Sequence, residues 1–492
     1  MSGMVKYRPS KSFLLTMAGM VPVGAVLVFG LLPELEAISK PPVPGVITFP
    51  AARPMDSPTT ARQSGGPRSS GGGWSLDWLQ GHYENLMAWD RNPWKRRKTG
   101  FGDHYFDLLA STNPADRAKA AEIRRQAQFL YQQVLKRYPE LAVTLREVPA
   151  ERNGFLQLLE LLERFQSDPA RCLPRDVPAL QLPESLTKFL SGSGPWDPAE
   201  ARAWLAKEKA LLDEVRAIGL LPEQSSAGID VNRYSFFSAR VVKGFSDALL
   251  LEARLAAEEG NVAGALDAIR AAKGVGDHIG KIETPSLLSV TVQILLNLQV
   301  QSQVVSHIIP ALPPGQFDPA AWEAAVRPEV LPPSEYSRIM KGEWHIGVQQ
   351  YILPIACDVE DPKYAPDPEA LIDFYSGRFA EVVATHDKPA IAEWATVAVP
   401  APPTTGHLSR SNRQAAEMMF VGEQAWSKGL LRAMHSTGMT NAAFAMMKGQ
   451  PIPADPIHGL PYVWDPATRQ LSPPADPVFE EQQLKPITVP AR

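Results

Sequence analysis

The chain has 492 residues, a length that predicts two to four domains or one large helical array. Hydrophobic residues make up 45% and charged residues 21%, as is typical of a globular protein, and the formal net charge of -4 excludes a general attraction to nucleic acid. Proline occurs 47 times, nearly twice its usual share of about 5%, which predicts many helices joined by long, stiff connections.

The N-terminus has the pattern of a membrane anchor. Three basic residues and no acidic one precede residues 13–32, which carry no charge, and two glutamates follow. An apolar stretch of this length just crosses a hydrocarbon core of about 30 Å. Because basic residues stay in the cytoplasm, we expect residues 1–12 there and the C-terminal domain outside, in a single-pass protein of the inner (cytoplasmic) membrane. The alternative is a signal peptide cleaved after Ala37.

Residues 33–73 are predicted to be a linker rich in proline, glycine and serine, which holds the folded part away from the bilayer. Residues 74–105 are rich in aromatic side chains and contain a run of four basic residues at 95–98. Aromatic and basic residues together are typical of binding to nucleic acid or acidic lipid. The alternative is a short amphipathic helix over 76–88 followed by a solvated charged turn. Since the domain is expected to be exported, we predict no nucleic-acid partner.

Residues 74–449 are predicted to form a mainly α-helical domain, with a candidate sub-boundary near 310–333. Apolar residues at helical spacing predict helices over 116–138, 154–165, 198–218, 236–259, 262–272, 318–326, 334–353, 368–386, 389–397 and 409–435. An acceptor side chain followed by proline satisfies the first free amides of a helix and presets its first turn. We therefore interpret four residues as helix caps and not as acidic active-site groups: Asn113, Asp197, Asp318 and Asp367.

The centre of the chain, residues 234–312, is expected to be its core. A helix that ends at Gly260-Asn261 precedes a short alanine-rich helix. The alanine, leucine and glycine placement over 248–272 resembles a tetratricopeptide-like hairpin, which implies an array with a concave binding surface. An irregular helical bundle is the alternative.

The next helix is predicted to begin at Pro285 and is apolar nearly all round. It is long enough to cross a membrane. Glutamines at 293, 299, 301 and 303 make such a crossing costly, so we expect a buried central helix instead.

The tail, residues 450–492, is rich in proline and is predicted to contain a small β-hairpin formed by 461–464 and 469–471. The pattern Asp-Pro, Gly, Pro-Tyr and Trp over 455–464 resembles the C-terminal end of type II secretion pseudopilins. It is similar also to the tails of uncharacterised bacterial proteins with a single membrane span. No prepilin cleavage site precedes residues 13–32, so neither assembly nor metal binding is carried over from the pseudopilins.

No strong catalytic motif is present, since the chain contains neither HExxH nor GxSxG. Residues 274–281 look like a phosphate-binding loop, but they miss its spacing, and Ile282 stands where a metal-binding hydroxyl is needed. We therefore interpret 274–281 as a loop between helices. Cys172 and Cys357 show no metal-ligand spacing. Outside the cytoplasm they are a candidate disulfide, and two separate buried thiols are the alternative.

Three clusters place histidine beside a carboxylate and so have the residue types for proton transfer near neutral pH: Asp103-His104, Asp277-His278 and Glu343-Trp344-His345. Adjacent residues on a helix point in different directions, so sequence neighbours need not cooperate. Glu343, Trp344 and His345 are the candidate binding residues, because Trp344 and Tyr351 are suited to line a pocket there. We assign no catalytic residue, cofactor or metal ligand.

These observations favour a membrane-anchored, exported α-helical protein that binds or scaffolds other components of the bacterial cell envelope. Its expected partners are the membrane, through residues 13–32, and envelope proteins. Two alternatives remain, and neither is favoured over binding. One is a hydrolase with its site between helices, and the other is a structural part of a secretion or pilus-like assembly.

Overall fold

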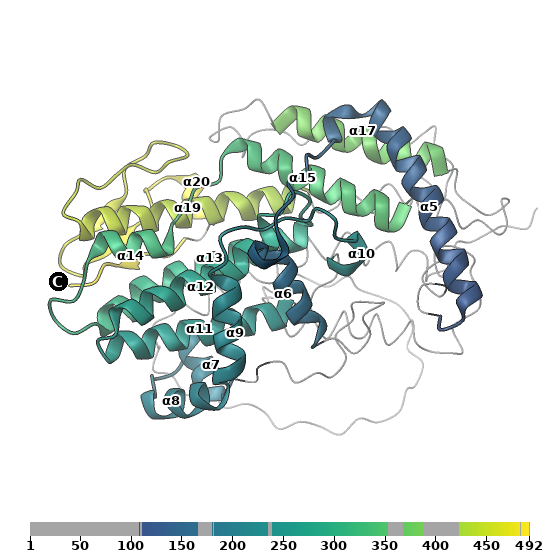
Figure 1. Cartoon of the computed structure of the whole chain (residues 1–492). Coiled ribbons are helices and arrows are strands. Elements are labelled where there is room, and N and C mark those ends of the chain that lie inside the picture. The colour runs from purple at the N-terminus through teal and green to yellow at the C-terminus, as the bar shows by residue number, and fades with distance from the viewer. Residues whose placement is uncertain are drawn as a thin grey trace, which may run out of the picture.

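The computed structural model describes residues 108, 111–165, 180, 182–234, 239–352, 368–386, 423–482 and 484–491. The expected span, linker and basic aromatic segment lie outside these residues, as do Asp103, His104, Cys172 and Cys357. Within the described ranges, no helix combines the length and apolar character that a bilayer crossing requires. The predicted class is confirmed there, because helices dominate the fold and strands are few (Figure 1).

The helices in chain order are α5 (Pro114–Arg137), α6 (Gly154–Glu163), α7 (Glu184–Leu190), α8 (Pro198–Lys207), α9 (Lys209–Gly219), α10 (Val231–Tyr234), α11 (Ala239–Glu258), α12 (Val262–Gly280), α13 (Leu287–Gln303), α14 (Pro319–Val326), α15 (Pro333–Ile346), α17 (Pro368–His386), α19 (Glu423–Met447) and α20 (Pro477–Gln482). π-Helical turns continue α13 and α15 over Val304–Ile308 and Gly347–Ile352. Short 3-10 turns occupy Pro139–Leu141, Ala150–Arg152 and Ile309–Ala311.

Helix starts follow the predicted cap chemistry. The side chains of Asn113, Asp197 and Asp318 each accept a backbone N–H in the first turn of α5, α8 and α14. Asp367 lies outside the described residues. The single helix predicted over 198–218 is wrong in one respect, because the chain breaks at Glu208 into α8 and α9.

The central hairpin of α11 and α12 is present as predicted. Gly260 makes the turn with a positive φ of 73°, and the Asn261 side chain caps α12 by accepting the N–H of Gly264 at 3.0 Å. The predicted loop over 274–281 is wrong, because α12 continues to Gly280. A Cβ on Gly274 would lie 1.8 Å from the Gly219 carbonyl oxygen of α9. These glycines therefore permit close helix contact and do not mark a loop.

α13 is the buried central helix that its glutamines predicted. Gln299 donates to Asp247 Oδ1 at 2.6 Å, and Gln303 donates to the Leu190 carbonyl at 2.8 Å. These amides are satisfied inside the protein, as buried polar groups must be. The helix begins at Leu287, two residues after Pro285, because the Ser286 side chain forms its cap.

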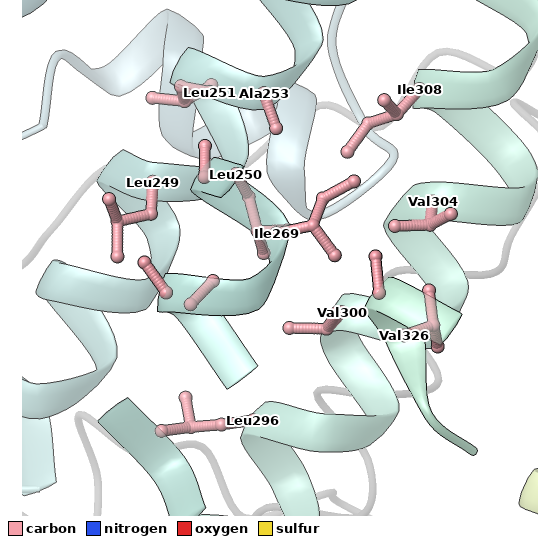
Figure 2. Packing of buried hydrophobic residues seen from close by; sticks show 14 of the residues in the cluster. Leu249, Leu250, Leu251, Ala253, Ile269, Leu296, Val300, Val304, Ile308 and Val326 are labelled. Atoms are coloured by element: carbon pink, nitrogen blue, oxygen red, sulfur yellow. The ribbon is translucent and has the colours of Figure 1, made fainter. Parts of the chain in front are cut away.

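The described residues form three buried apolar clusters, and the two larger ones join most of the helices. The larger one centres on α11, α12 and α13, and Figure 2 shows side chains of these helices, the following π turn and α14 converging on one another. The labelled residues are Leu249, Leu250, Leu251, Ala253, Ile269, Leu296, Val300, Val304, Ile308 and Val326. The second cluster lies between α5, α15 and α17. Both α13 and α19 contribute side chains to both clusters and so join them.

The predicted β-hairpin in the tail is confirmed. β1 (Val463–Asp465) pairs antiparallel with β2 (Gln470–Ser472), with Trp464 opposite Leu471, and β3 (Ile487–Thr488) adds a third strand. The sheet packs on α19, which places the C-terminus beside the main helices (Figure 1). The predicted end of that helix at residue 435 is wrong, since α19 continues to Met447.

Candidate functional site

A polar pocket lies where α12, α13 and α19 meet the segment that follows α14. Its cavity volume is about 40 Å³. The lining is partly apolar, with Leu298, Leu331 and Met434, and partly polar and charged. The polar lining residues are Lys273, Lys281, Gln293, Asn297, Gln301, Arg327, Glu329 and Thr437.

Two lysines that line the pocket belong to an ion-pair triad on α12, centred on Asp277. Lys273, Asp277 and Lys281 are spaced four residues apart, which places them on one face of the helix. Asp277 Oδ2 lies 2.5 Å from Lys273 Nζ and 3.4 Å from Lys281 Nζ. The Lys273 side chain is only 7% exposed, so its charge is held inside the protein by this carboxylate. Such a charge is costly to bury unless it is paired.

The other oxygen of Asp277 is held by α13. Asp277 Oδ1 accepts hydrogen bonds from Gln293 Nε2 and from Asn297 Nδ2, each at 3.2 Å. Burial alone would raise the pKa of Asp277. The two lysine charges, with hydrogen bonds from Lys273 and Asn297, nevertheless hold that pKa below its ordinary value. Asp277 is therefore an ionised anchor for the surrounding donors.

Two buried amide oxygens in this pocket have no partner among the described residues. They are Asn297 Oδ1 and Gln301 Oε1. The amide nitrogen of Gln301 makes only a long contact of 3.4 Å with Thr437 Oγ1. Buried polar atoms in native proteins are nearly always hydrogen-bonded to protein or to water. These two acceptors, on residues that line the pocket, are therefore unsatisfied within the described residues.

Two cations lie at the mouth. Lys281 Nζ is 2.7 Å from Glu329 Oε2 and is shared between that carboxylate and Asp277. Arg327 follows the last turn of α14 in a left-handed conformation, with a φ of 42°. Its guanidinium is exposed and has no carboxylate partner in the described ranges. The mouth can therefore attract an anion without first breaking an ion pair of Arg327.

His278 turns away from this pocket. Its Nε2 lies 2.9 Å from the Ile218 carbonyl oxygen, and its ring packs against Gly154. Burial lowers the pKa of His278, so the ring is neutral at pH 7. Asp277 and His278 thus serve different neighbours, as expected for adjacent residues on a helix.

The three candidate binding residues on α15 also have separate partners. Glu343 Oε2 accepts the backbone N–H of Leu287 at 2.7 Å, at the first turn of α13. Burial raises the pKa of Glu343, with that hydrogen bond opposing the shift. Trp344 is fully buried and donates through Nε1 to Ser376 Oγ at 3.1 Å. Each contact ties α15 to another helix.

His345 contacts Tyr131 of α5 and Gln349 of the π turn. The Tyr131 hydroxyl lies 2.6 Å from His345 Nδ1, and the two rings meet edge to face at 5.3 Å. Burial lowers the pKa of His345 to about 4. The structure therefore does not bring Glu343, Trp344 and His345 to a common point.

The pocket residues were missed from the sequence, although a signal was present. Lys273, Asp277 and Lys281 repeat at four-residue spacing, and so do Gln293, Asn297 and Gln301. That spacing is informative only on a helix. The predicted loop over 274–281 concealed the first set, and Gln293 and Gln301 of the second set gave only evidence against a membrane crossing.

Comparisons with other proteins give no further guide to the site. No protein-family model, curated protein or solved structure matches the chain.

Proposed function

We propose that the protein is a membrane-anchored binding protein, whose exported helical domain holds a small polar anion in the pocket above Asp277. The observation that carries this proposal is the pair of buried acceptors, Asn297 Oδ1 and Gln301 Oε1, without partners beside an ion-pair triad. The anchor at 13–32 and the linker at 33–73 would hold this domain outside the cytoplasm, near the membrane surface.

The lining chemistry indicates what kind of molecule would fit. An anionic group would sit at the mouth between Lys281 and Arg327, where the charge of Arg327 is not neutralised by a described carboxylate. Hydroxyl or amine groups further in would donate to the two amide oxygens. The apolar lining residues would contact a short carbon chain. A small hydroxy acid combines these features.

Binding is favoured over hydrolysis by the state of the charged groups. Asp277 is kept ionised by its donors, which makes it a poor base at neutral pH because its pKa is low. Thr437 is the one hydroxyl among the lining residues, and its partner is the amide of Gln301 and not a base. An activated nucleophile needs an adjacent base.

Thermal unfolding of the full-length protein in mild detergent tests the proposal. Gluconate, citrate and glycerol 3-phosphate serve as hydroxyl-bearing anions, and sorbitol serves as an uncharged probe. We expect at least one anion to raise Tm, because a ligand that binds only the folded state stabilises it. Sorbitol should have no effect.

Variants then locate the effect. Lys281→Met and Gln301→Leu should each remove the Tm shift. Lys209→Met is the matched control, because Lys209 forms the same four-residue ion pair with Asp213, at 2.6 Å, on the exposed face of α9. A Tm that responds to none of the anions, or that responds equally in wild type and Lys281→Met, contradicts the proposal.

A further inference from the structure

The mouth of the pocket carries an internal ion pair between Lys281 and Glu329. Lys281 Nζ lies 2.7 Å from Glu329 Oε2 and 3.4 Å from Asp277 Oδ2. Asp277 Oδ2 is closer to the other lysine of the triad, with Lys273 Nζ at 2.5 Å. Glu329 is therefore the nearest partner of Lys281, and its carboxylate occupies the lysine to which a bound anion would have to donate its charge.

Glu329 is held less firmly than Lys281. The Glu329 side chain is 54% exposed, compared with 27% for Lys281. Lys281 caps the C-terminus of α12, and its backbone N–H donates to the Asp277 carbonyl at 2.8 Å. Glu329 lies in residues 327–332, which connect α14 to α15 without regular secondary structure. Rotation of the Glu329 side chain into solvent would thus release Lys281 without moving a helix.

The size of the cavity indicates that such a release is needed for binding. The cavity volume is about 40 Å³. One water molecule needs about 10–15 Å³, so the cavity has room for roughly three or four of them. Glycolate, the smallest hydroxy acid, has more non-hydrogen atoms than that and fits only if the mouth opens. Glu329 is the one carboxylate among the residues that line the pocket.

Charge balance favours the exchange of one carboxylate for another. Lys273 and Lys281 are positively charged and face two carboxylates. Burial would lower the pKa of Lys281, but the carboxylates of Asp277 and Glu329 raise it above its ordinary value, so Lys281 stays charged. When Glu329 turns away, Lys281 keeps only its longer contact with Asp277. A monovalent anion in place of Glu329 restores the balance.

We propose that Glu329 competes with the ligand for Lys281: its carboxylate pairs with Lys281 when no ligand is bound, and the carboxylate of a small hydroxy acid displaces it. This inference rests on the proposed function and adds which group of the ligand contacts Lys281. Glu329 is then a specificity-determining residue, because an uncharged molecule cannot replace its charge beside Lys281.

Titration of the full-length protein with glycolate, in mild detergent and in a buffer free of carboxylic acids, tests the proposal by saturation-transfer NMR. Glu329→Gln keeps the size of the side chain and removes its charge. It should lower the dissociation constant for glycolate by about 2- to 5-fold, the range expected when a competing exposed ion pair is lost. Ethylene glycol lacks the carboxylate, and the substitution should not improve its binding.

Glu323→Gln is the matched control. Glu323 pairs with a lysine in the same way, since its Oε2 lies 2.9 Å from Lys448 Nζ, and it is located on α14 outside the lining of the pocket. This variant changes the net charge by the same amount as Glu329→Gln. It should leave the dissociation constant for glycolate unchanged.

The outcomes separate this inference from the proposed function. Glycolate binding that is tighter in Glu329→Gln than in wild type, or that is detected only in that variant, supports the competition. Equal or weaker binding in Glu329→Gln overturns it, as does an equal gain in Glu323→Gln or an equal gain for ethylene glycol. If glycolate binds neither protein, the inference is overturned, and the proposed function fails as well only if none of the larger anions raises Tm.

Discussion

The segment Glu343-Trp344-His345 shows how far sequence neighbours can diverge. Each side chain contacts a different element, namely the start of α13, Ser376 of α17 and Tyr131 of α5. The sequence indicated that adjacent helical residues separate. It could not indicate their partners, because Tyr131 is 214 residues from His345 along the chain. The same limit hid the hydrogen bond between His435 of α19 and Asp455 of the tail, since nothing local in either segment points to the other.

His345 should make stability depend on pH. Its imidazole has a pKa of about 4 in the folded protein against about 6.5 when unfolded, so the unfolded state binds the extra proton. The contribution is fully present above pH 6.5 and is lost as pH falls toward 4. At pH 5 the loss is about 2 kcal/mol, because one pKa unit corresponds to 1.36 kcal/mol.

Urea unfolding at pH 7.5 and pH 5, followed by tryptophan fluorescence, measures this loss. His345→Gln should lose less stability than wild type between the two pH values, because glutamine does not titrate. An identical loss in both proteins would show that His345 is not buried as a neutral ring.

At the scale of elements, the features set by nearby residues were predicted correctly, whereas the end of α12 was not. The caps at Asn113, Asp197 and Asp318, the Gly260 turn and the tail hairpin depend on residues near in sequence, and these predictions were correct. The continuation of α12 through its glycines depends on α9, which is distant in sequence but packs against α12. A glycine that admits a neighbouring helix looks the same in sequence as a glycine that ends one.

Two alanine substitutions on α12 test which glycine is needed for the close approach of a neighbouring helix. Gly274→Ala should destabilise by about 1–3 kcal/mol, because the new Cβ would meet the Gly219 carbonyl at 1.8 Å. Gly276→Ala should stabilise by up to about 1 kcal/mol, because its Cβ would meet Leu296 at an ordinary 3.4 Å and alanine favours a helix. Urea unfolding midpoints measure both, and equal effects from the two changes would contradict close packing at Gly274.

At the scale of the whole molecule, the described residues form a helical body, and residues 13–32 are predicted to anchor it to the membrane. Mainly helical content was predictable, because apolar spacing recurs in most segments. The division of the core into clusters was not, since it depends on which helices α13 and α19 contact. The predicted orientation is a property of the complete chain and needs a test in cells.

Alkaline phosphatase and green fluorescent protein fused after Arg492 provide that test, because the first is active only outside the bacterial cytoplasm and the second fluoresces mainly inside it. We expect phosphatase activity in the membrane fraction. Removing residues 1–32 should move the protein to the cytosol and abolish the activity. Fluorescence without phosphatase activity in the intact fusion would contradict export.

The bridging position of α19 has a consequence for how the protein melts. Leu430 and Leu431 belong to one apolar cluster, and Phe444 and Met447 belong to the other. If α19 unfolds, both clusters lose buried apolar side chains, so the two clusters should unfold together. Differential scanning calorimetry should therefore record a single heat-absorption peak for the described body, and a proline placed midway along α19 should split it into two.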